Sequence, residues 1–230
     1  MAKPKVKEIN GFEYILYEKK TYEPAVALQH SQEYYQWLDQ RRTVRDFSSR
    51  AVPRELIENL ILSASTAPSG AHKQPWNFCA VSNPEIKKQI RIAAEKEEYD
   101  SYHGRMSERW LKDLEALGTD WHKPFLEIAP WLIIVFKKAF ELDDEGEKTN
   151  NYYVNESVGL AAGFLLTAIH NAGLVALTHT PSPMNFLVKI LDRPANERPF
   201  LLIPVGYPAE EVYVPRLERR SLEMVSEFYE

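Results

Sequence analysis

Apolar side chains recur at helical spacing in several stretches of the chain. After Pro53, positions 56, 57, 60, 61 and 64 are apolar, and this i, i+3/i+4 stripe predicts a helix with one buried face. Pro84 opens a second predicted helix, which runs to about Ala94 and continues into the charged run 95–100. A long helix is expected over roughly 155–171, ended by Gly173.

Uninterrupted apolar runs predict strands that are covered on both faces. The runs are Trp76–Val81, Ala129–Phe136, Leu174–Thr178 and Leu201–Val205. Strand and helix patterns alternate along the chain, which indicates an α/β or α+β domain with a covered sheet.

The remaining stretches are short or polar. Ser31 is a suitable N-cap for a helix through Leu38, and a short helix is expected around 184–191. Residues 1–30 are expected to form an irregular arm with short extended pieces, and 142–150 an acidic surface loop. The charged, aromatic stretch 101–125 is a candidate mobile lid.

Composition places the chain among soluble globular proteins: 230 residues, 44% hydrophobic and 27% charged. A net charge of −5 predicts no general affinity for nucleic acid. A single cysteine, Cys79, excludes an internal disulfide and indicates a reducing compartment, where it is expected to pack inertly in the core. The longest apolar stretch, 158–169, is too short to span a bilayer and no signal peptide is visible, so we expect no membrane contact and a cytoplasmic location.

Two segments carry candidate binding chemistry. Arg41, Arg42, Thr43 and Arg45 place three guanidinium groups and a hydroxyl close together, which suits a phosphate, although a solvated helix end would look similar. About twenty-five residues later, the small residues 68–71 allow a flat ring to approach the backbone, although Pro-Ser-Gly is also ordinary turn chemistry. A phosphate and a planar heterocycle on one ligand indicate flavin mononucleotide (FMN).

Other chemistries find no support. His72 and His179 have no Cys, Asp or Glu at ligand spacing, so no metal site is predicted. Neither a Gly-x-Gly-x-x-Gly fingerprint nor a Gly-x-Ser-x-Gly elbow occurs, so NAD(P)H would have to visit the flavin site itself.

The arginine cluster, the segment Pro68–Trp76 and the late segment Leu202–Pro208 together resemble the flavin-dependent nitroreductase superfamily. Within it, the residues around Glu98, Tyr102, Arg109–Trp110 and 119–123 resemble the iodotyrosine deiodinases. The resemblance implies an α+β (α/β sandwich) nitroreductase-like fold with a central mixed sheet. It also implies a domain-swapped homodimer that binds FMN at the subunit interface. We expect no counterpart of the membrane-anchor segment of vertebrate members, as in a bacterial-type soluble form.

The resemblance also implies the organisation of the chain. Residues 1–34 would be an N-terminal arm, 35–215 the FMN-binding domain with a lid at about 95–125, and 216–230 an extension that packs on the partner subunit.

The resemblance assigns flavin contacts to particular residues. Arg41, Arg42, Thr43 and Arg45 would hold the phosphate, helped by Arg219 or Arg220. Pro68, Ser69 and Gly70 would lie along the isoalloxazine edge, and the Ala71 amide would donate to an oxygen of the substrate. Thr178, His179 and Thr180 would contact the flavin, and either Thr180 or Thr178 would donate a hydroxyl to flavin N5.

Substrate contacts follow in the same way. Glu98 and Tyr102 share one helix face and would take the α-ammonium group of an amino acid, and Lys123 would take its carboxylate. Without the resemblance, the run 95–98 would be interpreted as a solvated face.

The implied activity is FMN-dependent reductive dehalogenation of 3-iodotyrosine and 3,5-diiodotyrosine to tyrosine and iodide. The electron donor, NAD(P)H or a reductase, stays open. The alternatives are a broad NAD(P)H-dependent nitroarene or quinone reductase, and a flavin- or amino-acid-binding sensor without turnover.

Overall fold

The computed structural model describes residues 4–230 and divides into two compact units, which meet between Arg41 and Arg42. In the first unit, β1 (Val6–Ile9) and β2 (Phe12–Ile15) form an antiparallel hairpin, followed by helix α1 (Pro24–Asp39). Asn10 and Gly11 both have positive φ, as a two-residue hairpin turn requires.

The predicted start of the first helix at Ser31 is wrong. α1 begins at Pro24, whose fixed φ suits the first helical turn. Ser31 lies inside the helix, where its hydroxyl donates to the Leu28 carbonyl at 2.7 Å instead of capping an N-terminus.

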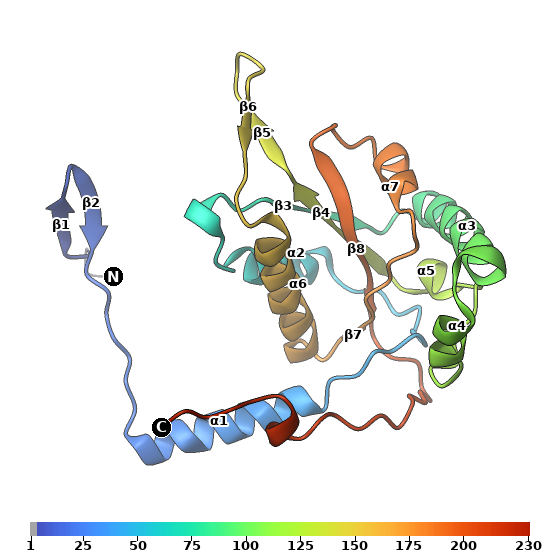
Figure 1. The fold of residues 1–230 in the computed structure, drawn as a ribbon, viewed down its shortest axis with the longest axis horizontal. Coiled ribbons are helices and arrows are strands. Elements are labelled where there is room, and N and C mark those ends of the chain that lie inside the picture. The colour runs from blue at the N-terminus through green and yellow to red at the C-terminus, as the bar shows by residue number, and fades with distance from the viewer. Residues whose placement is uncertain (1–3) are drawn as a thin grey trace. The chain divides into compact units, whose positions relative to one another are not determined.

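The second unit is built on a four-stranded sheet with the order β3-β4-β8-β7 (Figure 1). Its strands are β3 (Trp76–Val81), β4 (Trp131–Lys138), β7 (Val175–Ala176) and β8 (Glu197–Gly206), and every neighbouring pair is antiparallel. The parallel element of this mixed sheet is a single bridge between Thr43 and Ala176.

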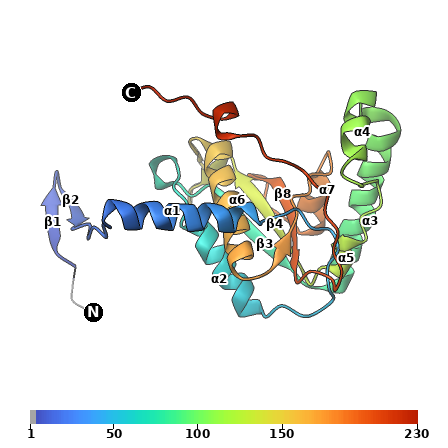
Figure 2. The same ribbon diagram turned by 90° about the horizontal axis from the view of Figure 1, so that it is seen from below.

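Helices cover both faces of this sheet (Figures 1 and 2). α2 (Arg54–Ser65) and α6 (Val154–Asn171) cover one face, and α3 (Pro84–Asp100), α5 (Phe125–Ile128) and α7 (Asn185–Ile190) cover the other. α4 (Glu108–Glu115) extends beyond α3 (Figure 2) and has no buried residue. The unit also contains three short non-α helices: η1 (Gly70–His72), the π-helical η2 (Ser101–Arg105) and η3 (Leu222–Met224). The stretch proposed as a lid therefore contains η2 and α4.

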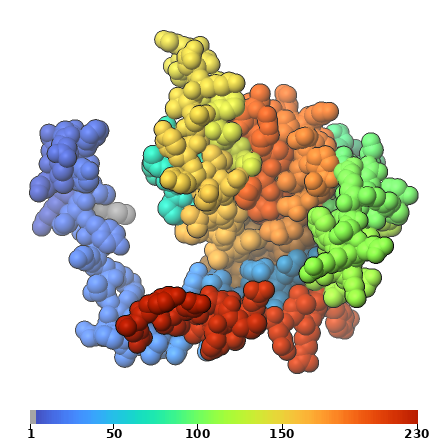
Figure 3. Space-filling view, in the orientation of Figure 1, coloured from blue at the N-terminus to red at the C-terminus, as the bar shows by residue number. Residues whose placement is uncertain are grey.

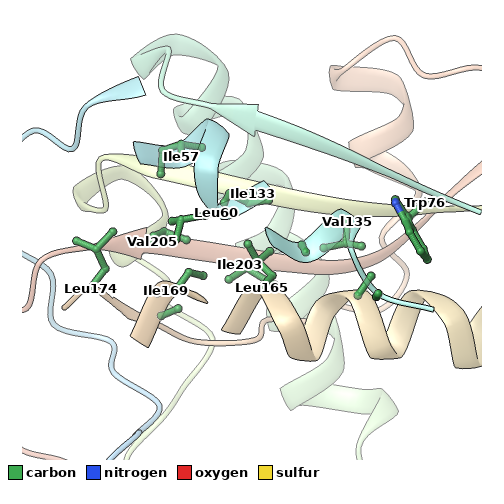
Figure 4. Packing of buried hydrophobic residues seen from close by; sticks show 14 of the residues in the cluster. Ile57, Leu60, Trp76, Ile133, Val135, Leu165, Ile169, Leu174, Ile203 and Val205 are labelled. Atoms are coloured by element: carbon green, nitrogen blue, oxygen red, sulfur yellow. The ribbon is translucent and has the colours of Figure 1, made fainter. Parts of the chain in front are cut away.

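The alternation of side chains along β4 divides the interior into two cores. Ile133 and Val135 face a cluster that contains the buried residues of α2 and α6, seen close up in Figure 4. Leu132, Ile134 and Phe136 face the opposite cluster, formed with α3, α5 and α7. A strand with both faces buried must be apolar throughout, as the sequence of β4 is.

The strand limits differ from the predicted ones where a prolyl ring or the partner strand decides them. β4 begins after Pro130, because proline cannot donate to the ladder. β8 starts earlier than predicted, since its first residues pair with Lys137 and Lys138 of β4 beyond the apolar core. The strand expected over 174–178 is reduced to the two residues of β7.

The segment 142–150 is not a plain loop. β5 (Phe140–Leu142) and β6 (Lys148–Asn150) pair as an antiparallel hairpin. Asp143 closes its turn by accepting from the amides of Glu145 and Glu147 at 3.0 and 2.8 Å.

Among the described residues, neither a membrane-spanning helix nor a metal-binding cluster is found. No helix within 4–230 is long and apolar enough to cross a membrane. The same range holds no group of three or more His, Cys, Asp and Glu side chains that would suit a metal ion.

Candidate active site

A cavity of about 210 Å³ lies between the lid segment and the edge of the sheet beyond β7. Figure 3 shows the green surface of α3 and α4 against the orange surface that follows β7. The lining residues are Arg45, Glu98, Tyr102, Met106, Trp110, Leu114, Thr119, Lys123, Phe125, Leu177, Thr178, His179 and Thr180. The cavity thus combines an apolar and aromatic wall with a larger set of polar and charged groups, which suits a polar ligand that carries a ring.

Helix α3 places Glu98 in this cavity. The Asn83 side chain caps the helix by accepting from the amides of Glu85 and Ile86 at 2.9 and 3.1 Å. The buried row of the helix consists of Lys87, Ile90, Ala94 and Glu98, spaced three or four residues apart. Glu98 therefore ends the buried stripe, and only 8% of its surface is exposed.

Lys123 meets Glu98 from the segment before α5. Its Nζ lies 3.5 Å from Glu98 Oε2 and donates to Thr119 Oγ1 at 3.2 Å and to the Asp120 carbonyl. The Lys123 amide donates to Glu95 Oε1 at 2.7 Å, which fixes the backbone. With 3% of its surface exposed, the ammonium group is held by these partners in place of water.

Tyr102 closes the same corner. Its hydroxyl donates to the Thr119 carbonyl at 3.1 Å, and its ring lies 5.6 Å from Lys123 Nζ. Because Tyr102 follows Glu98 by four residues, it stays on the same side as α3 continues into η2.

Burial disfavours the charged forms of the ionisable side chains in this part of the cavity. Burial raises the pKa of Glu98 and lowers the pKa of Lys123, and the attraction between the two groups counters both shifts. Burial also raises the pKa of Tyr102. A buried ion pair of this kind costs desolvation, so its presence beside a cavity points to binding more than to stability.

The segment 178–180 forms the opposite wall. Thr178 and Thr180 are exposed to the cavity, whereas His179 between them is buried. His179 pairs with Leu202 of β8 through two backbone hydrogen bonds of 2.8 and 3.0 Å. Burial, with Lys123 and Arg45, lowers the pKa of His179 to about 3, so the ring is neutral near pH 7.

The arginine segment runs along the same edge of the sheet. The Val44 amide donates to the Ala176 carbonyl at 3.2 Å, and Val44 and Phe47 are buried. This anchoring brings Arg45 into the cavity lining and leaves Arg42 half-buried and Thr43 exposed beside it. Arg41 ends the first unit, where its amide donates to the Leu38 carbonyl at 3.0 Å. Arg219 and Arg220 lie on the exposed tail.

The small-residue turn at 68–72 has a tightly constrained backbone. Ala71 and His72 have φ of 48° and 54°, a left-handed conformation that costs a non-glycine residue about 1 kcal/mol or more. A Cβ on Gly70 would lie 2.9 Å from the Tyr153 ring and 3.1 Å from the Tyr152 carbonyl, so only glycine fits. Strain of this kind concentrates at ligand sites.

This turn and the cavity lie at opposite edges of the sheet. The turn leads into β3, one outer strand, whereas 178–180 continues from β7, the other. Three inter-strand spacings separate these edges, about 14 Å, and both ribbon views show the blue-green turn far from α4 (Figures 1 and 2). One chain therefore brings Arg45, Glu98, Tyr102, Lys123 and 178–180 together, but does not bring Ala71 to them.

The donor groups fit FMN. The guanidinium group of Arg45 suits the phosphate, Thr178 and Thr180 line the same cavity, and the His179 Nε2 atom has no hydrogen-bond partner among the described residues. Half-buried Cys79 lies outside this cavity, and burial raises the pKa of its thiol, which disfavours the reactive thiolate.

The fold and this arrangement are those of a flavoprotein reductase, and the chain belongs to the nitroreductase family, whose profile matches residues 38–207. It is 64% identical over 216 residues to an iodotyrosine deiodinase of Haliscomenobacter hydrossis, covering 94% of this chain and 97% of the relative. Iodotyrosine deiodinase 1 of Homo sapiens is 43% identical over 214 residues, covering 93% of this chain and 74% of the relative.

Solved structures agree with this assignment. A crystal structure of oxidized iodotyrosine deiodinase bound to FMN and 3-iodo-L-tyrosine superposes with a TM-score of 0.73 and 31% identity. The match covers 85% of this chain and 98% of that one. A BluB-like flavoprotein of Clostridium difficile 630 (86% and 99% coverage) shares the fold at a TM-score of 0.63 and 18% identity. The resemblance inferred from the sequence is confirmed.

Several cavity residues had no functional role in the sequence-based prediction. Met106, Trp110 and Leu114 line the cavity from the lid, spaced four apart, and Phe125 and Leu177 complete the apolar wall. Trp110 and Leu114 are four apart on α4, and this spacing is a signal that the sequence contains, whereas Met106 precedes the helix. The pairing of Thr119 with Lys123 and Tyr102 has no sequence signal.

Proposed function

We propose that the protein is an FMN-dependent reductive dehalogenase that converts 3-iodotyrosine and 3,5-diiodotyrosine to tyrosine and iodide. One observation carries the proposal: a buried carboxylate and a buried ammonium group lie 3.5 Å apart beside an aromatic-walled cavity. A charge pair of this kind is a receptor for the zwitterion of an amino acid. Nitroarenes and quinones carry no such zwitterion.

Binding replaces one ion pair by two. The α-ammonium group of the substrate takes the place of Lys123 at Glu98, with the Tyr102 hydroxyl beside it. The substrate carboxylate then accepts from Lys123. Exchange within a buried site lets both protein charges keep a partner throughout, which avoids the cost of an uncompensated charge.

The aromatic ring of the substrate is held by the lid. Trp110, Met106 and Leu114 offer an apolar wall that excludes water from the cavity. When bound, FMN supplies the two electrons that, with one proton, replace the carbon–iodine bond by carbon–hydrogen and release iodide. Arg41, Arg42, Thr43 and Arg45, with Arg219, would hold the phosphate, and Thr180 or Thr178 would donate to flavin N5.

We infer that two chains complete each site. Pro68, Ser69, Gly70 and Ala71 lie at the far edge of the sheet from Glu98, so one chain cannot apply both halves to one ligand. A homodimer in which the turn of one protomer faces the cavity of its partner brings the halves together. The Ala71 amide would then donate to the phenolate oxygen of the substrate. The proposed extension 216–230 would pack on the partner subunit.

Anaerobic titration of the reduced, FMN-loaded protein with 3-iodotyrosine tests the proposal. We expect one equivalent to reoxidise the flavin and to release one equivalent of iodide and of tyrosine. Reoxidation by nitroarenes but not by 3-iodotyrosine would establish a nitroarene reductase instead. A flavin that neither compound reoxidises would indicate a sensor.

A further inference from the structure

His179 is a buried polar residue whose role is not explained by packing. Only 7% of its surface is exposed, and its Nε2 atom is one of two buried side-chain atoms in residues 4–230 without a hydrogen-bond partner. Buried polar atoms in native proteins are nearly always paired, so an unpaired one at a cavity wall points to a ligand or to a partner that moves.

The position of this ring is fixed. Two backbone hydrogen bonds to Leu202 hold the residue at the sheet edge. The ring packs edge-on against Phe125, with 5.7 Å between centroids and 88° between planes. The imidazole is therefore held in place with its Nε2 on the side of Glu98.

The carboxylate of Glu98 lies close to this nitrogen. His179 Nε2 lies 4.0 Å from Glu98 Oε1, whereas Lys123 Nζ lies 3.5 Å from the other oxygen, Oε2. Each carboxylate oxygen thus has its own neighbour. A separation of 4.0 Å is about 1 Å too long for a hydrogen bond, so a small movement of Glu98 away from Lys123 would close it.

We propose that His179 is a positioning residue for Glu98, donating Nε2–H to Oε1 when the α-ammonium group of a halotyrosine displaces Lys123 from the carboxylate. The inference rests on the proposed function. It gives Glu98 a fixed second partner in the bound state and links substrate recognition to the segment that carries Thr178 and Thr180.

The charge state of the ring suits this role. The titratable groups around it are Glu98 on α3, Tyr102 on η2, Lys123 before α5 and Arg45 on the arginine segment. The two cations and burial keep the imidazole neutral. A neutral donor orients the carboxylate without cancelling its charge, so Glu98 keeps its full attraction for the substrate ammonium. A third cation here would compete with the substrate.

Two substitutions distinguish the hydrogen bond that the His179 side chain would donate from the space that the side chain fills. His179→Gln places an amide nitrogen where Nε2 lies, and His179→Asn places one at the position of Nδ1, out of reach of Glu98. Calorimetric titration of the oxidised FMN-loaded protein would use 3-iodotyrosine and 3-(3-iodo-4-hydroxyphenyl)propionate, which keeps the ring and carboxylate but lacks the ammonium group.

We expect His179→Asn to raise the Kd of 3-iodotyrosine about tenfold or more and His179→Gln to raise it less than about threefold. Neither should change the Kd of the deaminated acid. Equal losses for both ligands, equal losses in both variants, or no loss would overturn the inference. Should His179→Asn not fold with FMN, His179→Leu replaces it, with the same expected pattern.

Measurements on the wild-type protein distinguish a failure of the His179 inference from a failure of the proposed dehalogenase function. Absence of iodide release from 3-iodotyrosine by the wild type would remove the proposed function. Normal release by the wild type together with unaltered binding by His179→Asn would overturn the role of His179 alone.

Discussion

Glu98 differs in environment from the other acidic residues beside it in the sequence, although all belong to one charged run. The run 95–98 contains three carboxylates, and in the folded chain they differ. Glu95 accepts from Arg91 and from the Lys123 amide, Glu97 pairs with half-exposed Arg105, and Glu98 faces the cavity. Only Glu98 has its charge available to a ligand within the cavity.

Replacing Glu98 by Gln should weaken 3-iodotyrosine binding by more than about tenfold, because the substrate ammonium loses its anionic partner. FMN content should stay unchanged. Calorimetric titration of the FMN-loaded protein measures the effect, with Glu127→Gln as control, since Glu127 pairs with Arg91 away from the cavity. An unchanged Kd would remove Glu98 from the receptor.

His179 should also be visible in the pH dependence of stability. Its pKa falls from 6.5 in the unfolded chain to about 3 in the folded one, so the unfolded state binds more protons between these values. The stability contributed by the neutral ring is therefore complete above pH 6.5 and is lost as pH falls toward 3.

Between pH 7 and pH 5 this linkage amounts to about 2 kcal/mol. Chemical denaturation should show the wild type losing that much more stability than His179→Gln over the same interval. The difference between the two proteins isolates His179 from the opposite contribution of Glu98. Parallel pH profiles would mean that the imidazole titrates normally.

At the scale of elements, most helices and strands were predictable, because their side-chain patterns are local. β3 has the limits read from its apolar run, and α2 buries the predicted stripe of Ile57, Leu60 and Ala64. α1 was misplaced because Pro24 starts a helix with no apolar stripe, whose residues are not buried within this chain.

The candidate site was predictable residue by residue only through the family resemblance. The helical row through Ile90 and Ala94 could have shown which acidic residue is buried, since Glu98 continues it. The burial of His179 has no local signal, because Thr178 and Thr180 flank it. Pairing with Leu202, far along the chain, determines its burial.

Asn83 should matter for the stability of α3 and not for ligand recognition at its other end. Asn83→Ala removes the oxygen that accepts from two helix amides and should cost about 1 kcal/mol of unfolding free energy. Asn83→Asp keeps an accepting oxygen and should cost less. Denaturant melts measure both, and equal losses would show that the side-chain cap contributes nothing.

At the scale of the whole second unit, β4 serves two cores at once. Ile133 and Ile134 are both fully buried but face opposite layers of helices. One strand therefore connects the layer that carries Glu98 with the layer built from α2 and α6. The order of the strands in the sheet sets the distance between the small-residue turn at 68–72 and the cavity. This order depends on pairing between distant segments, so local sequence patterns do not predict it.

Ile133→Ala and Ile134→Ala should each lower the unfolding free energy by about 2–5 kcal/mol, since each leaves a cavity in a close-packed interior. Ile92→Ala, on an exposed position of α3, should cost less than about 1 kcal/mol. Fluorescence and circular dichroism should report a single shared transition for both core variants. Two separate transitions would show that the layers unfold independently.

The mutual pairing of Glu98 and Lys123 has a consequence for how added salt should act. The Glu98–Lys123 pair has no net charge before the ligand binds, and the zwitterionic ligand has none either. Binding at this pair should therefore neither take up nor release counterions. Halotyrosine affinity should therefore stay nearly constant from dilute buffer to about 0.5 M sodium chloride, where exposed charges are largely screened. Capture of the phosphorylated flavin by guanidinium groups should weaken over the same range. If both affinities declined together, the carboxylate of Glu98 and the ammonium group of Lys123 would have to be exposed to solvent when the ligand binds.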